Sequence, residues 1–282
     1  ALGDPERNDY AVWVGGRGHL ATIKAADPTY DLAVLEIKVD SLTPMPLGEA
    51  KDLKKGQIVI ALGNPLAIAR DGSPSAPWGI VSNVHRKAAP RPDVDSGIEQ
   101  KDTLHHYGTL IQTDARLERG TSGGALLNIK GEMVGLTSAV AALPGSEKSA
   151  GFAIPVGDTF RHVVQQLKLG RTVAYGFLGV APNDSFNGWQ DGVRIDNVVN
   201  GTPSASSGLE NGDVITHIGD TPLKSAGDLI LTVSSYPAGQ TVPVRLRRNS
   251  GRTIVRHESA FAVARDARGL HNRPSTFRGT QL

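Results

Sequence analysis

The sequence contains no cysteine, so disulfide bridges, zinc–thiolate sites and cysteine nucleophiles are all excluded. Aromatic residues make up only 5% of the chain, and no apolar run approaches the length of a membrane-spanning helix. The formal net charge is only +2, with acidic and basic residues interspersed, so the composition gives no reason to expect a nucleic-acid partner. We therefore expect a chain that uses no metal, no cofactor, no nucleic acid and no membrane span.

Glycine and proline are abundant instead, with 33 and 17 residues among the 282. Together with 39% hydrophobic residues, this composition is typical of many short strands joined by turns. The length is sufficient for two or three domains. The composition therefore predicts a fold dominated by β-structure.

One stretch, residues 118–128, places a serine among glycines. Gly120 and Gly123 flank Ser122 at positions where a side chain would crowd a bound substrate, and glycine reaches backbone angles that strain other residues. A serine on such a loop can expose its hydroxyl and turn two backbone N–H groups toward one point, where the oxyanion of acyl transfer would form. The stretch indicates a serine nucleophile, and a glycine-rich hairpin with an incidental serine is the simpler alternative for these five residues alone.

The pattern of residues 120–124 fits both the nucleophile elbow of the α/β hydrolases and the serine loop of chymotrypsin-like proteases. An elbow requires a helix directly after the serine. Here an apolar run over 125–127 is followed by a turn signal over 128–131 and a second strand-like run over 132–136. Strand, turn and strand favour the chymotrypsin-like loop, and a circular dichroism spectrum dominated by β-signal would count against the hydrolase.

The remaining segments are mostly strand-like until the first helical period appears. Apolar residues recur at helical spacing after Pro155, up to a stop signal at Gly170. Residues 87–108 are charged and without period, so we interpret them as an inserted loop. A second β-rich unit begins near residue 176, with one helical segment over 225–236. The expected strands outside the serine hairpin are 10–14, 19–24, 31–37, 57–62, 79–82, 110–113, 150–154 and 240–247.

Five motifs occur in the order and approximate spacing of the HtrA (Deg) family, which the chain resembles over roughly residues 11–259. The resemblance implies a fold that is dominated by β-structure, with a chymotrypsin-like double β-barrel whose first barrel is N-terminally incomplete, followed by a PDZ domain. The expected boundaries are 1–171 for the protease domain, 174–262 for the PDZ domain and 263–282 for a tail or the start of a further segment. The five motifs are Asp27–Leu35, Gly63–Pro65, Ile111–Ala115, Gly120–Gly124 and Gly151–Pro155.

The resemblance also assigns roles to individual residues of a serine protease. Ser122 is the expected nucleophile, and Asp31 is the acid that orients a histidine. The backbone N–H groups of Gly120 and Ser122 form the expected oxyanion hole. Asp27 and Asp114 are the rival acids, and Asp27 is expected to shape a turn because a proline follows it.

No histidine stands where the family has its general base. His19 precedes Asp31 but lies inside an expected strand, and His85, His105 and His106 lie in or beside the inserted loop. We therefore expect the base to come from a segment ahead of residue 1. Because removing one member of a catalytic triad costs several orders of magnitude in rate, hydrolysis by the chain as printed should be nearly abolished.

Two binding sites follow from the same resemblance. Leu117, Ala139 and Val140 are expected to line the pocket that selects the residue before the cleaved bond. No acidic residue lies at these positions, so a basic side chain would be buried without a partner, and cleavage after small aliphatic residues is expected. In the PDZ domain one loop would hold the C-terminal carboxylate of a peptide, with apolar residues around its last side chain. The residues expected there are Phe177, Leu178, Gly179, Val180, Leu229 and Val233, which a small β-domain would also need for its core.

The sequence thus predicts an HtrA-like serine endopeptidase that cleaves unfolded or misfolded proteins by a Ser-His-Asp mechanism. The expected partners are unfolded chains and peptides, the expected location is the periplasm or the extracellular space, and the family leads us to consider a homotrimer. The alternative from another class is a pseudoprotease, an inactive scaffold that binds peptides. The gene sequence upstream of residue 1 distinguishes the two, because a histidine between small residues ahead of Asp31 would support the enzyme.

Overall fold

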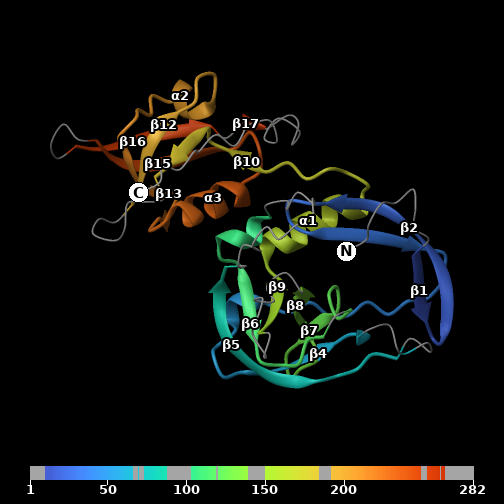
Figure 1. Cartoon of the computed structure of the whole chain (residues 1–282). Coiled ribbons are helices and arrows are strands. Elements are labelled where there is room, and N and C mark those ends of the chain that lie inside the picture. Colours follow the sequence, from blue (N-terminus) through green and yellow to red (C-terminus); the bar gives the residue numbers. More distant parts are fainter. Residues whose placement is uncertain are drawn as a thin grey trace, which may run out of the picture. The chain divides into compact units, whose positions relative to one another are not determined.

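The computed structural model describes residues 10–65, 69, 73–87, 103–118, 120–138, 150–183, 192–248, 253–260 and 262–263. The chain divides into two compact units, 1–173 and 174–282 (Figure 1). Strands dominate both units, as predicted from the composition. Each unit is described separately below.

The first unit begins with an open antiparallel sheet of three strands, in the order β1–β2–β3, at the place of the expected first barrel. Gly15 and Gly16 have positive φ angles of 55° and 78°, which suit the tight two-residue turn between β1 and β2. This turn is shorter than the four-residue connection expected over 15–18, so β2 begins earlier than predicted and continues further. The strands are β1 (Tyr10–Val14), β2 (Arg17–Asp27) and β3 (Leu32–Ile37).

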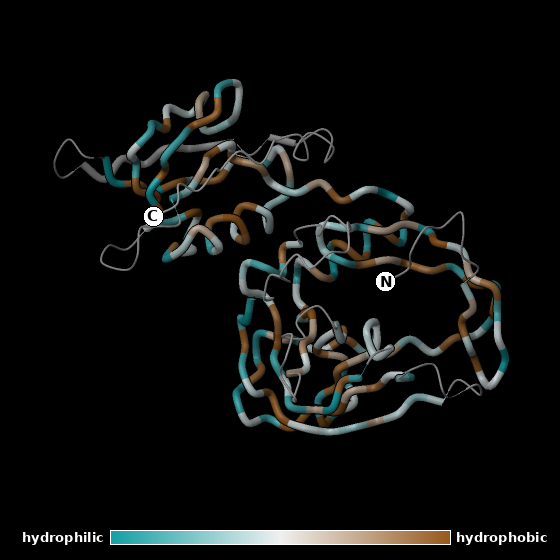
Figure 2. Tube along the Cα trace, viewed as in Figure 1, coloured by the Kyte–Doolittle hydropathy of each residue, from teal (hydrophilic) through white to brown (hydrophobic). Residues whose placement is uncertain are grey.

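A second sheet of the first unit closes into a barrel, in the order β4–β5–β6–β9–β8–β7. Successive side chains of a strand point to opposite faces, and buried residues accordingly alternate with more exposed ones along β4 and at the start of β5, while hydrophobic residues occupy much of the barrel (Figure 2). Val59, Val81, Ile111 and Leu126 are at most 2% exposed and belong to one core cluster inside this barrel. The strands are β4 (Ile58–Leu62), β5 (Trp78–Arg86), β6 (Leu110–Thr113), β7 (Ala125–Leu127), β8 (Met133–Ser138) and β9 (Gly151–Pro155).

The hairpin that follows Ser122 decides between the two interpretations of its motif. Strand β7 pairs with β8 in antiparallel register, and the connection over 128–131 is stabilised by the hydrogen bond from Gly131 N to Asn128 O, 3.0 Å long. A strand therefore follows the serine, whereas the nucleophile elbow of an α/β hydrolase needs a helix there. The prediction of strand, turn and strand is confirmed.

Helix α1 (Asp158–Lys168) ends the first unit and packs against β2 and β3. Phe160, Val163 and Leu167 form its buried face, at the helical spacing expected from the sequence. The prediction that Pro155 opens this helix is wrong, because Pro155 is the last residue of β9 and pairs with Gly135. The described part of the unit also contains the short 3-10 helices η1 (Ala50–Asp52) and η3 (Leu104–Tyr107).

In its described residues, the second unit is built from a β-sheet and two helices. Its strand order is β11–β12–β13–β15–β16, with β14 beside β13 and a separate pair β10–β17. Leu178, Ile195, Ile215, Leu229 and Val244 are among the buried residues of its core cluster. Its strands are β10 (Gly176–Phe177), β11 (Val180–Pro182), β12 (Val193–Val198), β13 (Val214–Ile218), β14 (Thr221–Pro222), β15 (Thr241–Arg248), β16 (Thr253–Ala260) and β17 (Ala262–Val263), and its helices are α2 (Pro203–Ser206) and α3 (Ala226–Ser235).

The tail expected over 263–282 lies outside the described residues, apart from Val263 at the end of β17. Among the helices of the described chain, none has the length and apolar character of a membrane-spanning segment.

Candidate active site

Ser122 lies on the loop between β6 and β7, between two glycines in the left-handed region. Gly120 has a φ of 93° and Gly123 a φ of 87°, angles that a side chain would make costly. Ser122 is exposed, whereas its neighbour Thr121 is buried with 7% of its surface accessible. The sequence was therefore sufficient to predict an exposed serine on a sharply turning loop.

Hydrogen bonds to strand β8 anchor this serine loop to the barrel. The N–H of Gly123 donates to the Thr137 carbonyl on β8 at 2.8 Å, and the N–H of Thr137 donates to the Gly124 carbonyl at 2.8 Å. The Thr137 hydroxyl also donates to the carbonyl of Thr121. Within the loop, the N–H of Thr121 donates to the Glu118 carbonyl and the N–H of Gly123 donates to the Thr137 carbonyl. These bonds hold the peptide groups that lie next to the N–H groups of Gly120 and Ser122.

Close backbone packing fixes the loop against β4 as well. A Cβ atom on Gly124 would lie 2.0 Å from the carbonyl oxygen of Leu62, far inside van der Waals contact. A Cβ atom on Gly63 would lie 3.1 Å from the Thr121 methyl carbon. The glycines of two separate motifs, one ending β4 and one around the serine, thus permit the approach of the two segments.

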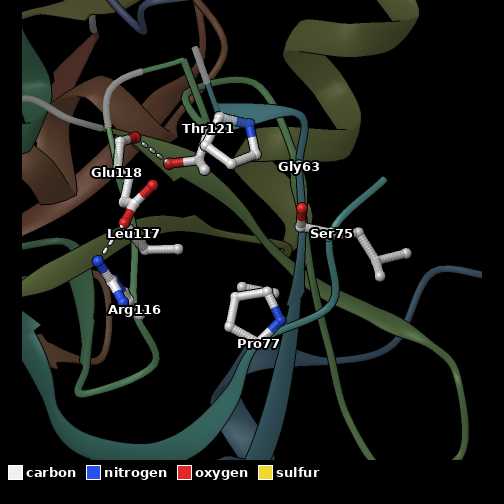
Figure 3. A pocket seen from close by; sticks show the side chains of 10 residues that line it. Gly63, Ser75, Pro77, Arg116, Leu117, Glu118 and Thr121 are labelled. Carbon is white, nitrogen blue, oxygen red and sulfur yellow. Dashed lines mark hydrogen bonds and ion pairs between the residues drawn. The ribbon is translucent and has the colours of Figure 1, made fainter. Parts of the chain in front are cut away.

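A cavity of about 200 Å³ lies beside the serine loop, and Leu117 is one of the residues that line it (Figure 3). The same leucine packs on β9, since a Cβ on Gly151 would come within 2.8 Å of its Cδ1. Arg116 and Glu118 form an ion pair of 2.6 Å at the rim. The lining residues are Ala61, Leu62, Gly63, Pro65, Ser75, Pro77, Arg116, Leu117, Glu118 and Thr121, while Ala139 and Val140 lie outside the described residues.

Asp31 lies on the connection between β2 and β3, with its side chain exposed. Its φ of 54° is in the left-handed region, which non-glycine residues adopt seldom and aspartate more readily than most. The rival Asp27 is buried, and its Oδ1 accepts the N–H of Thr29 at 3.0 Å, so it shapes the turn as expected. The other rival, Asp114, accepts the N–H of Ile80 at 2.6 Å and joins β5 to the segment after β6.

None of the histidines that the structure describes has a hydrogen bond to the carboxylate of Asp31. His19 lies on β2, paired with Val12 of β1, as expected for a strand residue. His105 is only 1% exposed and lies on η3, against the loop that carries Asp31. Burial lowers the pKa of His105, and the hydrogen bond to the Tyr30 carbonyl and the charge of Asp31 oppose this without reversing it.

This location of His105 was not predicted. The sequence analysis assigned residues 87–108 to one inserted loop. The one local signal for η3 is the spacing of Thr103 and His106, which form the capping box at its start. The contact between His105 and Tyr30 joins residues 75 positions apart, which no local pattern reveals.

The residues expected around a peptide in the second unit lie mostly in its core. Leu178, Leu229 and Val233 are between 2% and 6% exposed and belong to the main cluster, whereas Val180 is half-buried at the start of β11. Phe177 is half-buried on β10 and pairs with Ala262. The low exposure of these side chains agrees with the alternative interpretation of the sequence, in which they form the core of the domain.

Gly179, between β10 and β11, has a φ of 84°. A Cβ there would lie 2.3 Å from the Cβ of Thr202, so glycine is needed for packing inside the unit as well as for any approach of a ligand. The carbonyl of Gly179 accepts the N–H of Val199 at 2.9 Å and the hydroxyl of Ser204 at 3.0 Å. Among the strands that the structure describes, β12 is the neighbour of β11, which follows this bend and ends the strand order of the sheet.

No group of three or more His, Cys, Asp or Glu side chains suited to a metal ion occurs in the described ranges. The serine loop itself offers a serine hydroxyl and backbone N–H groups, and the chain also carries the exposed carboxylate of Asp31. That set matches acyl transfer when a histidine completes it.

Comparisons with known proteins agree with this description. Residues 4–136 match the family of trypsin-like peptidase domains, and residues 176–256 match the PDZ domain family. The serine protease PepD of Mycobacterium tuberculosis is 35% identical over 244 residues, covering 84% of this chain and 50% of the relative. The periplasmic pH-dependent serine endoprotease DegQ of Escherichia coli is 33% identical, covering 83% of this chain and 50% of the relative.

A solved structure of an HtrA-type protease, AlgW with a tripeptide, has a TM-score of 0.71 and 27% sequence identity, covering 91% of this chain and 81% of that chain. The chain spans about half the length of the curated relatives PepD and DegQ.

Proposed function

Because the chain belongs to the HtrA (Deg) family of serine proteases, we propose that it is part of a serine endopeptidase that cleaves unfolded or misfolded proteins. The observation that carries this proposal is the serine loop, in which an exposed Ser122 stands between two left-handed glycines on a tightly anchored backbone. Such anchoring keeps the loop in one geometry, which catalysis by fixed N–H dipoles requires.

In the proposed mechanism Ser122 attacks the carbonyl carbon of the scissile peptide bond. A histidine takes the proton of the hydroxyl and later gives it to the leaving amine, while Asp31 holds the ring in the productive orientation. The N–H groups of Gly120 and Ser122 donate to the oxyanion of the tetrahedral intermediate. We propose that the histidine comes from the protein chain upstream of residue 1, because none of the described histidines hydrogen-bonds Asp31.

The substrate residue before the cleaved bond would enter a pocket with Leu117 on its wall. The apolar lining beside Leu117 supports small aliphatic residues there, since Arg116 and Glu118 at the rim already pair with each other. A basic substrate side chain would have to compete with Arg116 for the same carboxylate.

The second unit would bind the C-terminus of an unfolded chain. An extended peptide can add a strand to an open sheet edge, and β11 is such an edge in the described sheet. Val180 begins this strand and is half-buried beside the core, where it can contact the last side chain of the peptide. The affinity should be modest, on the order of micromolar, because burying one aliphatic side chain adds only about 1.5–3 kcal/mol to what the backbone hydrogen bonds and the carboxylate contribute.

Calorimetry with the 282-residue chain tests the peptide site. A peptide ending in valine should bind, and the same peptide with an amidated C-terminus should bind much more weakly. Equal affinity of the two peptides would leave the second unit without a carboxylate site.

We further propose that the protein works in the cell envelope or outside the cell as a homotrimer. The names of the relatives DegP and DegQ describe them as periplasmic, which supports the compartment. Light scattering of the protein with its upstream residues measures the number of subunits, and a monomer would exclude the trimer.

The endopeptidase itself is tested with an unfolded protein substrate such as reduced casein. The protein that includes the residues encoded upstream of Ala1 should cleave it, and the Ser122→Ala variant should not. Binding of casein without cleavage by the unmodified protein would instead favour a pseudoprotease that holds peptides.

A further inference from the structure

A short helix holds the loop that carries Asp31. The N–H of Leu104, the first residue of η3, donates to the carbonyl of Thr29 at 3.0 Å. Nε2 of His105 lies 2.8 Å from the carbonyl oxygen of Tyr30. Two consecutive carbonyl groups immediately before Asp31 are therefore bonded to two consecutive residues of η3.

The hydrogen bonds of His105 determine its tautomer. A carbonyl oxygen can only accept, so Nε2 must carry the proton and donate to Tyr30. In the neutral ring Nδ1 is then the acceptor, and the hydroxyl of Thr109 donates to it at 2.7 Å. Tyr30 packs against the ring in an edge-on arrangement, with ring centroids 4.9 Å apart. The imidazole is thus held at both nitrogens and against one aromatic ring.

The surroundings keep this ring neutral. Burial lowers the pKa of His105, and the neighbouring His106 lowers it further, whereas the Tyr30 carbonyl and the charge of Asp31 raise it. Tyr30 is 4% exposed, and burial together with Asp27 raises the pKa of its phenol. A neutral His105 ring has one donor, which bonds the Tyr30 carbonyl, and one acceptor, which bonds the Thr109 hydroxyl.

The same helix continues into the strand that precedes the serine loop. Gly108 and Thr109 join η3 directly to β6, and β6 leads into the cavity wall at Leu117 and on to Ser122. Because His105 bonds the carbonyl before Asp31, it connects the three-stranded sheet to the barrel. His105 therefore links the loop of the proposed acid, Asp31, to the chain segment that runs through β6 to the proposed nucleophile, Ser122.

We propose that His105 is a positioning residue for Asp31, which fixes the left-handed backbone of the acid by donating to the carbonyl of Tyr30. This inference rests on the proposed role of Asp31. His105 does not touch the reacting atoms, and its effect passes through the Tyr30–Asp31 peptide group. A φ of 54° at a non-glycine residue needs such support from its surroundings.

Two substitutions at this position separate the hydrogen bond from simple packing. In His105→Gln the side-chain amide can place an N–H near the position of Nε2 and keep the donor to Tyr30. In His105→Leu the ring volume is partly kept and the donor is lost. His106→Asn is the matched control, because His106 is on the same helix and its Nδ1 accepts the N–H of Thr103 at 3.1 Å, away from Asp31.

The rate of peptide cleavage is measured in the protein that includes its upstream residues. A misplacement of a catalytic group by about 1 Å can cost on the order of 100-fold in rate, so His105→Leu should lose up to that factor in kcat with an unchanged KM. His105→Gln should recover most of the rate, and His106→Asn should keep it. Equal losses in His105→Gln and His105→Leu, or a change in KM alone, would overturn the proposal.

A nuclear magnetic resonance measurement on the 282-residue chain needs no activity at all. We expect the ring of His105 to be neutral with its proton on Nε2, and the backbone amide of Asp31 to shift in His105→Leu and much less in His105→Gln. A proton on Nδ1, or an Asp31 signal unchanged in both variants, would refute the positioning role. If these shifts occur as expected while the longer protein cleaves nothing, the positioning stands and the proposed endopeptidase fails.

Discussion

Replacing Gly124 by alanine tests how strictly the backbone holds Ser122. The new Cβ would lie 2.0 Å from the Leu62 carbonyl oxygen and 3.0 Å from that of Thr121. Both neighbours are backbone atoms, so no side chain can rotate away to make room. The φ of Gly124 is outside the left-handed region, and the effect of the substitution is therefore steric.

The size of the effect follows from that distance. Real Cβ atoms essentially never approach closer than 3.0 Å, so the serine loop and β4 must separate by roughly 1 Å. Overpacking of this kind costs about 1–3 kcal/mol of folding stability. A shift of roughly 1 Å next to the nucleophile should also reduce the rate of acylation by on the order of 100-fold.

The matched control is Gly131→Ala in the β7–β8 hairpin. Gly131 has a φ of 78° and no atom within 4 Å of the added Cβ, so alanine there introduces backbone strain without a clash. That strain should cost about 1–2 kcal/mol of stability and leave the serine loop in place. Both substitutions are made in the protein that includes its upstream residues, and urea denaturation and the rate of reaction with a fluorophosphonate are measured for each variant. If Gly124→Ala reacts as fast as Gly131→Ala, the packing against Leu62 does not set the geometry of Ser122.

Three further predictions concern specificity, stability and pH. A peptide-library profile of the protein with its upstream residues should be dominated by valine, alanine or leucine before the cleaved bond, and a preference for lysine or arginine would refute the pocket around Leu117. Arg248→Gln should destabilise the second unit by about 3 kcal/mol in urea denaturation, because Arg248 bonds the buried Asp213 at 2.7 Å, whereas Arg245→Gln should cost less than about 1 kcal/mol since its partner is fully exposed. As the pH falls below 6.5, the unfolded His105 binds a proton that the buried ring resists, so the free energy of unfolding should fall less steeply in His105→Gln than in the unmodified chain. Parallel pH profiles of the two proteins would show that His105 is not buried as a neutral ring.

The parts of the fold that the sequence predicted are those specified by local patterns. The turn signal over 128–131 between two apolar runs was sufficient to predict the hairpin after Ser122, and helical spacing predicted the buried face of α1. The position of Pro155 was misjudged, because β9 runs up to this proline and α1 begins only at Asp158, so the strand and helix patterns lie next to each other in the sequence.

The contacts between distant segments could not be predicted in this way. The bond from His105 to Tyr30 depends on how η3 packs against the first sheet, and the surrounding sequence is charged and aperiodic. Similarly, Leu178, Leu229 and Val233 were expected around a peptide, and burial places them in the core of their unit. In a small domain the same apolar side chains can serve both purposes, and sequence patterns do not separate them.

The central claim is that Ser122 is the nucleophile of a serine endopeptidase. The most direct test treats the protein that includes its upstream residues with a fluorophosphonate and locates the adduct by mass spectrometry. We expect a single adduct on Ser122, no adduct in Ser122→Ala, and much slower labelling in Asp31→Asn and in the 282-residue chain alone. An adduct on another residue, or cleavage of casein that persists in Ser122→Ala, would contradict the account.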